Sequence, residues 1–89
     1  MISHTTDKFR KAFRNLPAPV QRKARKAFRL WRQAPGNPLL HYKQVHRIKP
    51  VYSIRIGLGW RAVGIKAEKH MIWFWVGSHG HYDKLIKQR

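Results

Sequence analysis

The last third of the sequence concentrates arginine, histidine and tyrosine residues, whose chemistry suits the binding and cleavage of phosphodiesters. Arg55 and Arg61 flank a Gly-Leu-Gly turn, and the segment Ser78-His79-Gly80-His81-Tyr82-Asp83 follows the last apolar run. Guanidinium groups bind phosphate through paired hydrogen bonds, and histidine accepts or donates protons near neutral pH. We therefore expect Arg55, Arg61, His79 and Tyr82 to form the chemical centre.

The reaction that suits this set is cleavage of RNA by its own 2′-hydroxyl group. Such an enzyme aligns the hydroxyl with the neighbouring phosphate, neutralises charge in the transition state and moves protons. It needs cations and a titrating group, with few carboxylates and no metal. In this interpretation Arg55 and Arg61 contact the phosphate, and His79 or His81 transfers a proton. Tyr82 either stacks on a base or donates a proton.

Each of these residues also has a purely structural interpretation. Arg61 can pair with Asp83 or Glu68 in an ion pair, and the arginine on the preceding strand can simply be solvated. His79 can cap a turn, and Tyr82 can pack at a rim with its hydroxyl group in water. Both interpretations stay open at this point, although clustering in a basic context favours the functional one.

The composition excludes several other kinds of catalytic site. There is no cysteine, which removes disulfide bonds, thiolate metal sites and cysteine nucleophiles. Six scattered histidines and only three acidic residues supply too few ligands for a dedicated metal site. Ser78 precedes His79, but nothing resembles a nucleophile elbow, so we expect Ser78 to be a turn or capping residue. No cofactor is expected.

Positive charge is the strongest global signal. Twenty Lys and Arg residues against three Asp and Glu residues give a formal net charge of +17. A body with this charge favours polyanions as partners, and nucleic acid is preferred over an anionic membrane surface or a merely solvated surface. The longest apolar run, Met71–Gly77, is far below the roughly 20 residues that span a bilayer. No leader-like segment opens the chain, and we expect a cytoplasmic protein without a membrane partner.

The elements that position these residues begin with two helices. The 89 residues suit one domain, 1–89. Thr5, Thr6 and Asp7 are N-cap candidates for a first helix, whose apolar stripe is Phe9, Ala12, Phe13 and Leu16. Pro-Ala-Pro separates it from a second helix that starts near Pro19 or Val20. The buried face of the second helix is Val20, Ala24, Ala27, Phe28 and Trp31.

Strands follow the loop at residues 34–38. A weak strand or arm is predicted at residues 41–47, and an alternating strand then places Tyr52, Ile54, Ile56 and Leu58 on one face. Gly57-Leu58-Gly59 permits a hairpin to a strand over residues 60–66, and a further turn leads to a central strand over residues 71–76. Residues 2–6 are either a short edge strand or a frayed end. The pattern predicts an α+β fold with two helices on one face of a small antiparallel sheet.

The order of residues resembles the RelE/ParE superfamily of bacterial type II toxins, and within it the RelE/HigB-like branch. The similarity rests on Phe-x-x-x-Phe-x-x-Leu-Pro-x-x-Val-Gln, Asn-Pro, Tyr-Ser-Ile-Arg-Ile-x-x-x-Trp-Arg-Ala and Trp-Val-Gly-Ser-His-x-x-Tyr-Asp-Lys-Leu, which span nearly the whole chain. It implies two helices against a sheet, a cognate antitoxin as protein partner, and ribosome-dependent cleavage of mRNA.

The resemblance also implies roles for single residues. Arg61 matches a strand arginine that contacts the scissile phosphate, and Arg55 matches a basic position on the preceding strand. His79 stands where relatives have Arg or His, and Tyr82 lies near a tyrosine used for stacking or proton transfer. Ser53 stands where Lys is frequent. No Glu occupies the position of the general base found in some relatives.

The remaining basic residues complete the expected substrate contacts. We expect Lys43, Arg47, His81 and Lys84 to bind RNA, and Lys43 can fill part of the gap left by the missing base. Two other functions stay open, because the superfamily also contains gyrase inhibitors of the ParE type and fold alone does not fix function. They are inhibition of DNA gyrase and non-catalytic binding of RNA or the ribosome.

Overall fold

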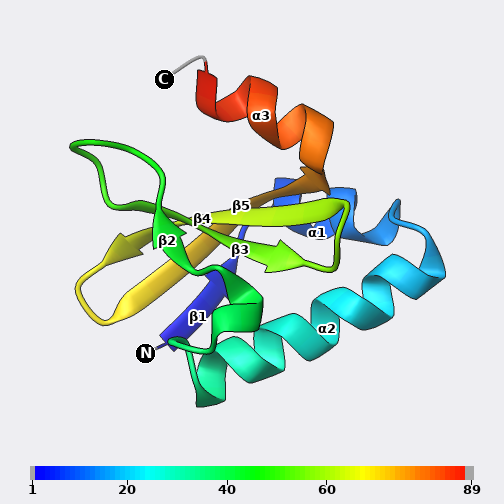
Figure 1. The fold of residues 1–89 in the computed structure, drawn as a ribbon, viewed down its shortest axis with the longest axis horizontal. Coiled ribbons are helices and arrows are strands. Elements are labelled where there is room, and N and C mark those ends of the chain that lie inside the picture. Colours follow the sequence, from blue (N-terminus) through cyan, green and yellow to red (C-terminus); the bar gives the residue numbers. More distant parts are fainter. Residues whose placement is uncertain (1, 88–89) are drawn as a thin grey trace.

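A five-stranded sheet with helices on both faces forms the protein (Figure 1). The structure is a computed structural model that describes residues 2–87. The strands are β1 (Ile2–Thr5), β2 (Lys43–Gln44), β3 (Val51–Ile56), β4 (Trp60–Ala67) and β5 (His70–Ser78). The helices are α1 (Asp7–Arg14), α2 (Ala18–Gln33) and α3 (His79–Lys87), with a 3-10 helix, η1 (Pro38–Leu40). The predicted α+β class is confirmed, and none of the described helices is long and apolar enough to cross a membrane.

The first two helices begin where local chemistry favours them. The Thr6 hydroxyl accepts a hydrogen bond from the backbone N–H of Phe9 at 3.0 Å, so Thr6 is the N-cap of α1. Asp7 lies in the first turn, where its charge favours the positive end of the helix dipole. α2 starts at Ala18, slightly before the predicted position, with Pro19 in its first turn.

The sheet is mixed, which corrects the prediction of a purely antiparallel one. The strand order is β1-β5-β4-β3-β2. β3, β4 and β5 form the predicted antiparallel meander, with β5 inside the sheet. β1 pairs in parallel with β5, Ile2 standing opposite His70 and Thr5 opposite Trp73. The N-terminal segment is therefore an edge strand. Sequence reasoning missed its direction because four residues give no signal of the partner strand.

The main core lies between the sheet and the α1–α2 side. Val20, Ala24, Ala27 and Trp31 of α2 are buried, as their spacing predicted, and Phe28 is partly buried against them. Burying a large apolar side chain of this kind contributes about 1.5–3 kcal/mol. The Trp73 ring has no exposed surface and meets the rings of Phe28 and Trp31 edge-on, at centroid distances of 5.1 and 5.2 Å.

The opposite face of the sheet is covered by α3, a helix that the sequence did not lead us to expect. We assigned no helix after the last strand, yet residues 79–87 are helical. Tyr82, Leu85 and Ile86 pack on Val51 and Val63 in a second, smaller core. Gly77, just before this segment, and Gly80, inside it, disfavour a helix in isolation. The apolar face supplied by β3 and β4 reverses that preference, because it gives an amphipathic helix a surface to bury.

Two local features at the β3–β4 hairpin differ from the prediction. Leu58 does not continue the buried face, since it lies in the turn and is 81% exposed. Gly57 adopts a left-handed φ of +64°, which redirects the chain there. In addition, Ser53 is 2% exposed although it was assigned to the polar face of β3. α3 covers that face, so polar and apolar positions of β3 are both buried.

Candidate functional site

Two arginines stand opposite each other at the β3–β4 hairpin end of the sheet. Arg55 on β3 is the direct cross-strand partner of Arg61 on β4. Both guanidinium groups donate to the carbonyl oxygen of Gly57, Arg55 through Nε at 3.2 Å and Arg61 through Nη1 at 3.5 Å. Neither forms an ion pair within residues 2–87. The hairpin therefore holds two uncompensated positive charges side by side, which is a suitable arrangement for binding an anion.

The environment of Arg61 fixes its position further. Its Nη1 also donates to the carbonyl oxygen of Trp60 at 2.8 Å, and its guanidinium carbon lies 5.9 Å from the centroid of the Tyr82 ring. Burial and then the charge of Arg55 lower the pKa of Arg61, while Tyr82 and Asp83 oppose the shift. The guanidinium remains charged at neutral pH because an arginine pKa starts so high.

Tyr82 lies beneath this cation. The residue is 5% exposed, and its hydroxyl group shares a hydrogen bond of 3.1 Å with the hydroxyl of Ser53. The interpretation in which its hydroxyl faces water is therefore wrong. A ring this enclosed presents no free face to a base, so the arrangement does not offer the stacking we expected. What it offers is a support for the Arg61 guanidinium and, through Ser53, a link between α3 and β3.

His79 opens α3 next to the arginine pair. Its backbone N–H donates to the carbonyl oxygen of Gly59 at 2.8 Å, which ties the start of α3 to the β3–β4 turn. Its Nδ1 lies 3.4 Å from the Asp83 carboxylate, one helical turn later. The ring also lies 6.1 Å from that of Tyr82. The geometry thus orients the imidazole with Nδ1 toward Asp83 and leaves Nε2 for another partner.

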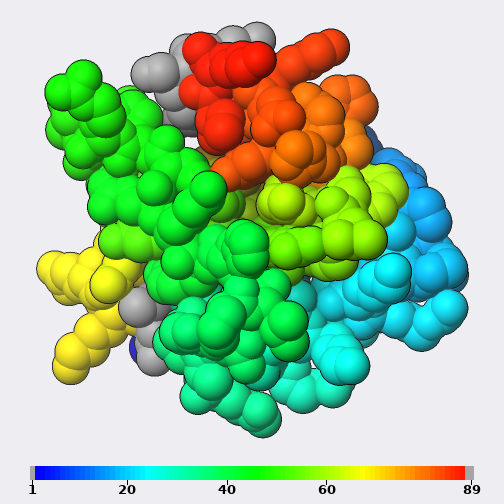
Figure 2. Space-filling model, viewed as in Figure 1, coloured from blue at the N-terminus to red at the C-terminus, as the bar shows by residue number. Residues whose placement is uncertain are grey.

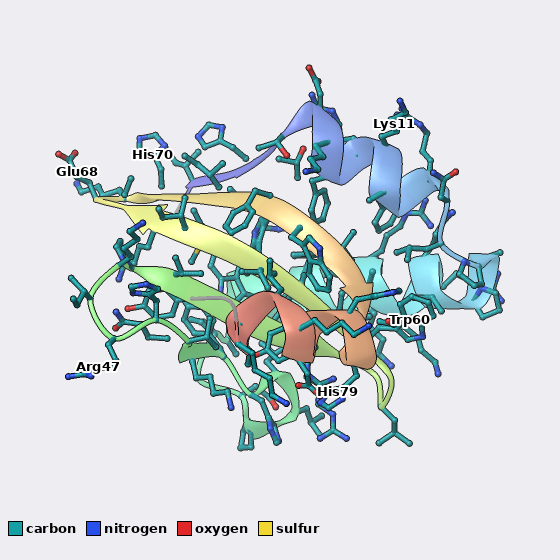
Figure 3. All side chains as sticks on the ribbon, turned by 90° about the horizontal axis from the view of Figure 1, so that it is seen from above. Lys11, Arg47, Trp60, Glu68, His70 and His79 are labelled. Atoms are coloured by element: carbon teal, nitrogen blue, oxygen red, sulfur yellow. The ribbon has the colours of Figure 1, made fainter. Side chains whose placement is uncertain are left out.

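Neither acidic partner suggested for Arg61 pairs with it. Asp83 pairs with His79 instead. Glu68 lies in the β4–β5 turn, at the opposite end of the sheet from Trp60 and His79 (Figure 3). Asp83 therefore acts on the imidazole, and the charge of the two arginines is left for a ligand.

The other predicted RNA-binding residues lie at varied distances from this centre. Ser78 caps α3, its hydroxyl oxygen accepting from the backbone N–H of His81 at 3.3 Å, as its predicted capping role required. The same hydroxyl contacts His81 Nδ1 at 2.9 Å, so His81 is engaged in the helix start. Lys84 is exposed on α3, and Lys43 is exposed on β2 opposite Ser53.

Arg47 is not part of the cluster. It belongs to the loop between β2 and β3, which projects from the body as the green segment in Figure 2. Figure 3 shows its side chain at the far side of the molecule from His79. Ile48, the next residue, is 86% exposed. The loop is therefore placed to contact a large partner. The arginine pair and His79 instead bind a ligand at the β3–β4 hairpin.

Sequence reasoning overlooked two residues that the tertiary structure adds to the cluster. His41, just after η1, has its Nε2 at 3.4 Å from Nη1 of Arg55. The Lys23 side chain of α2 approaches the hairpin turn, since a Cβ on Gly57 would lie 3.8 Å from Lys23 Nζ. No local pattern marks either residue, because their neighbours in space are far away in sequence.

A second feature lies on the other face of the sheet, between α1, α2 and β1. It is a groove of about 480 Å³ with an apolar floor and a basic rim. The floor includes Phe9, Phe13, Phe28 and Trp73, and the rim carries Arg10, Arg14, Arg25, Arg29 and Arg32. The sheet separates it from the arginine pair, so the two features can bind different partners.

The described residues do not support a metal centre. Residues 2–87 contain no group of three or more His, Asp or Glu side chains placed to hold a metal ion. His4 and His70 are close, with ring nitrogens 2.9 Å apart, but they satisfy each other across β1 and β5.

Comparison with solved structures identifies the fold. The isolated RelE toxin of E. coli superposes with a TM-score of 0.68 at 16% identity, covering 98% of this chain and 96% of its own. A chain of the RelB–RelE antitoxin–toxin complex from Methanococcus jannaschii gives a TM-score of 0.73 at 14% identity, covering 92% of this chain and 96% of its own. YafQ from E. coli strain BL21(DE3) gives 0.69 at 11% identity, covering 90% and 94%.

Sequence comparison identifies the family. No curated protein sequence matches this chain at a significant level. The family model of the ParE-like toxin domain, in contrast, matches residues 18–84, which include α2, the whole β2–β5 sheet and the start of α3. The chain therefore belongs to the ParE-like toxin domain family, within the RelE/ParE superfamily of type II toxins.

Proposed function

We propose that this toxin is a metal-independent endoribonuclease that cleaves mRNA on the ribosome and so inhibits translation. The observation that carries the proposal is the Arg55–Arg61 pair, which has no carboxylate partner within residues 2–87 and lies beside a histidine oriented by Asp83. Two uncompensated guanidinium groups suit the charge of a pentacoordinate phosphate better than that of a neutral target. The structural similarity to RelE and YafQ adds support at the level of the fold.

In the proposed reaction, the two arginines hold the non-bridging oxygens of the scissile phosphate. The 2′-oxygen of the preceding ribose attacks phosphorus in line while the bond to the 5′-oxygen breaks. His79 Nε2 donates a proton to the leaving 5′-oxygen, and Asp83 stabilises the imidazolium. Tyr82 keeps Arg61 in place from below. The products are a 2′,3′-cyclic phosphate and a 5′-hydroxyl end.

The ribosome supplies what an isolated 89-residue chain lacks. A charge of +17 draws the protein to ribosomal RNA, and the arm-like β2–β3 loop with Arg47 extends the basic surface beyond the cluster. Lys43, His81 and Lys84 are the remaining proposed contacts to RNA. Since rRNA is found in the cytoplasm, we propose that the toxin acts there.

The deciding experiment maps mRNA ends in a translation extract, with wild type beside Arg61→Ala. Cleavage that requires ribosomes and leaves 2′,3′-cyclic or 3′-phosphate ends supports the proposal, and Arg61→Ala should lose it. Intact mRNA in an extract with folded wild-type toxin would exclude it. If Arg61→Ala and His79→Ala reduce toxicity only as far as they reduce ribosome affinity, the protein binds without cleaving.

Inhibition of DNA gyrase is the second candidate, favoured by the match to the ParE-like family model. Purified toxin would then trap a cleaved complex between gyrase and supercoiled DNA. The same preparation used for mRNA mapping can be tested for this, and the absence of trapped DNA removes the candidate.

We propose an acidic antitoxin as the protein partner, and the α1–α2 groove as the place where it docks. Its aromatic floor suits apolar side chains, and its five rim arginines suit carboxylates that flank them. An acidic segment of this kind is typically disordered alone and folds on binding. Similar chains occur in RelB–RelE antitoxin–toxin complexes.

A further inference from the structure

The proposed reaction needs a group that takes the proton from the 2′-hydroxyl. His79 is oriented by Asp83 for donation, His81 Nδ1 is engaged by the Ser78 hydroxyl, and the Tyr82 hydroxyl is buried on Ser53. In the proposed reaction His79 is the donor, the Tyr82 hydroxyl is buried, and the described contacts of His81 are with Ser78 rather than with either arginine. His41 remains, because it is exposed and its Nε2 lies 3.4 Å from Arg55 Nη1.

The backbone at His41 supports a functional role. It has φ 45° and ψ 42°, a left-handed conformation that a non-glycine residue adopts at a cost in free energy. Such a conformation persists only where the surrounding structure dictates it. Leu40 on one side is 1% exposed, and Tyr42 on the other stacks on Tyr52 at 5.0 Å. Both neighbours are anchored, so the strained residue between them is directed outward to the arginine pair.

The contact with Arg55 also defines the protonation of His41 in this arrangement. A guanidinium group can only donate hydrogen bonds. His41 Nε2 is therefore the acceptor and carries a lone pair, with the proton of the neutral ring on Nδ1. The described structure places no carboxylate in contact with His41, and Arg55 is the charged group that faces it. When Arg55 turns to a bound phosphate, that lone pair becomes available to the substrate.

The contacts run in a continuous series from one imidazole to the other. His41 contacts Arg55, both arginines share the Gly57 carbonyl, Arg61 lies over Tyr82, and the Tyr82 ring adjoins His79. The two histidines are thus at opposite ends of the phosphate-binding pair. In-line attack requires a proton acceptor and a proton donor on opposite sides of phosphorus.

We propose that His41 is the proton acceptor of the reaction and the partner of His79. This inference rests on the proposed ribonuclease function. His41 Nε2 takes the 2′-hydroxyl proton as the 2′-oxygen–phosphorus bond forms. The bond from phosphorus to the 5′-oxygen breaks as His79 protonates that oxygen. His41 leaves the step protonated and His79 neutral, and exchange with water restores both.

The test replaces the imidazole and keeps the backbone. Glycine and asparagine both accept a left-handed conformation, so H41G and H41N separate the ring from the fold. Single-turnover cleavage of mRNA on programmed ribosomes should fall about 10²–10⁴-fold in both. Binding of an mRNA with a 2′-deoxy residue at the cleavage site should stay within about twofold. Free imidazole should restore cleavage by H41G, and the acidic limb of the pH–rate profile should disappear.

The matched control is H4A, which removes an exposed histidine on β1 from outside the cluster and should cleave at the wild-type rate. Wild-type cleavage rate in H41G with an unchanged pH profile would overturn the assignment of His41 alone. A loss of 2′-deoxy mRNA binding equal to the loss of cleavage would overturn it as well, since His41 would then act in binding. An inactive wild type would instead overturn the ribonuclease proposal itself.

Discussion

Arg55 and Arg61 are direct cross-strand partners on β3 and β4, and no carboxylate in residues 2–87 pairs with either of them. Like charges placed opposite each other in an antiparallel pair destabilise a sheet by roughly 0.2–1 kcal/mol. This repulsion between the two arginines occurs where a bound phosphate would neutralise it. A stability penalty confined to one cation pair is typical of a binding site that is prepared for an anion.

We predict that Arg55→Gln stabilises the fold and removes activity. Arg55 lowers the pKa of Arg61, so charged Arg61 is disfavoured in the folded state at every pH below that pKa. Removing Arg55 should raise the free energy of unfolding by about 0.5 kcal/mol at pH 7, and this gain should vanish as pH approaches the arginine range. Cleavage should fall about 10²–10³-fold.

Chemical denaturation at pH 7 and single-turnover cleavage measure the two effects. Arg22→Gln on the exposed face of α2 is the control, and its stability should match wild type. If Arg55→Gln instead lowers the free energy of unfolding, the contacts of Arg55 stabilise the fold by more than its repulsion with Arg61 destabilises it.

We predict that Tyr82→Phe lowers stability more than activity. The change leaves the Ser53 hydroxyl buried without its partner at 3.1 Å, which costs about 1–3 kcal/mol. The phenyl ring still supports Arg61, so cleavage at a permissive temperature should stay within a few-fold of wild type. Thermal unfolding and mRNA cleavage are the measurements. A loss of cleavage beyond about 100-fold would assign the hydroxyl to proton transfer.

We predict a steep decrease of RNA affinity with salt. Each phosphate that a cation neutralises in single-stranded RNA adds about −0.7 to the slope of log K against log salt concentration. Lys43→Gln and Arg47→Gln should each reduce the slope by about this amount. Lys69→Gln, beyond Glu68 in the β4–β5 turn, should leave it unchanged because no RNA contact is proposed for that turn (Figure 3). A flat salt profile for wild type would indicate a protein target.

We predict that charge reversal in the α1–α2 groove separates neutralisation from toxicity. Arg25 and Arg29 line the rim, and Arg25 lies 5.3 Å from the centroid of the Phe13 ring. Arg25→Glu with Arg29→Glu should weaken binding of the acidic antitoxin by at least tenfold, because carboxylates then face carboxylates. Cleavage should persist, since the groove and the arginine pair lie on opposite faces of the sheet. Co-expression tests this, and full rescue of growth by the antitoxin would argue for another docking surface.

We predict that Gly64→Ala is strongly destabilising. A Cβ there would lie 2.8 Å from Cε3 of Trp73 and 3.0 Å from the carbonyl oxygen of Ile72, at the irregularity between Val63 and Gly64. Overpacking of this kind costs about 1–3 kcal/mol. Gly36→Ala is the control, because a Cβ at Gly36 meets nothing within 4 Å. Equal unfolding midpoints for the two variants would contradict the prediction.

The amino-acid sequence by itself determined the elements whose signal is local. The Thr6 cap and the apolar spacing of α2 each arise from neighbours within a few residues, and each is confirmed. The charge of +17 and the absence of cysteine likewise follow from the composition alone. The hairpin at Gly57-Leu58-Gly59 was also predicted from the sequence, and the structure adds the register that makes Arg55 and Arg61 cross-strand partners.

Only the tertiary structure decided what covers these elements and which distant residues meet. Residues 79–87 become helical because β3 and β4 offer an apolar face, and that helix buries Tyr82 and gives Asp83 to His79 rather than to Arg61. His41 reaches Arg55 through a left-handed backbone that its buried neighbours impose. Such contacts join segments separated by many residues. They depend on packing of the whole chain, and no local pattern of residues encodes them.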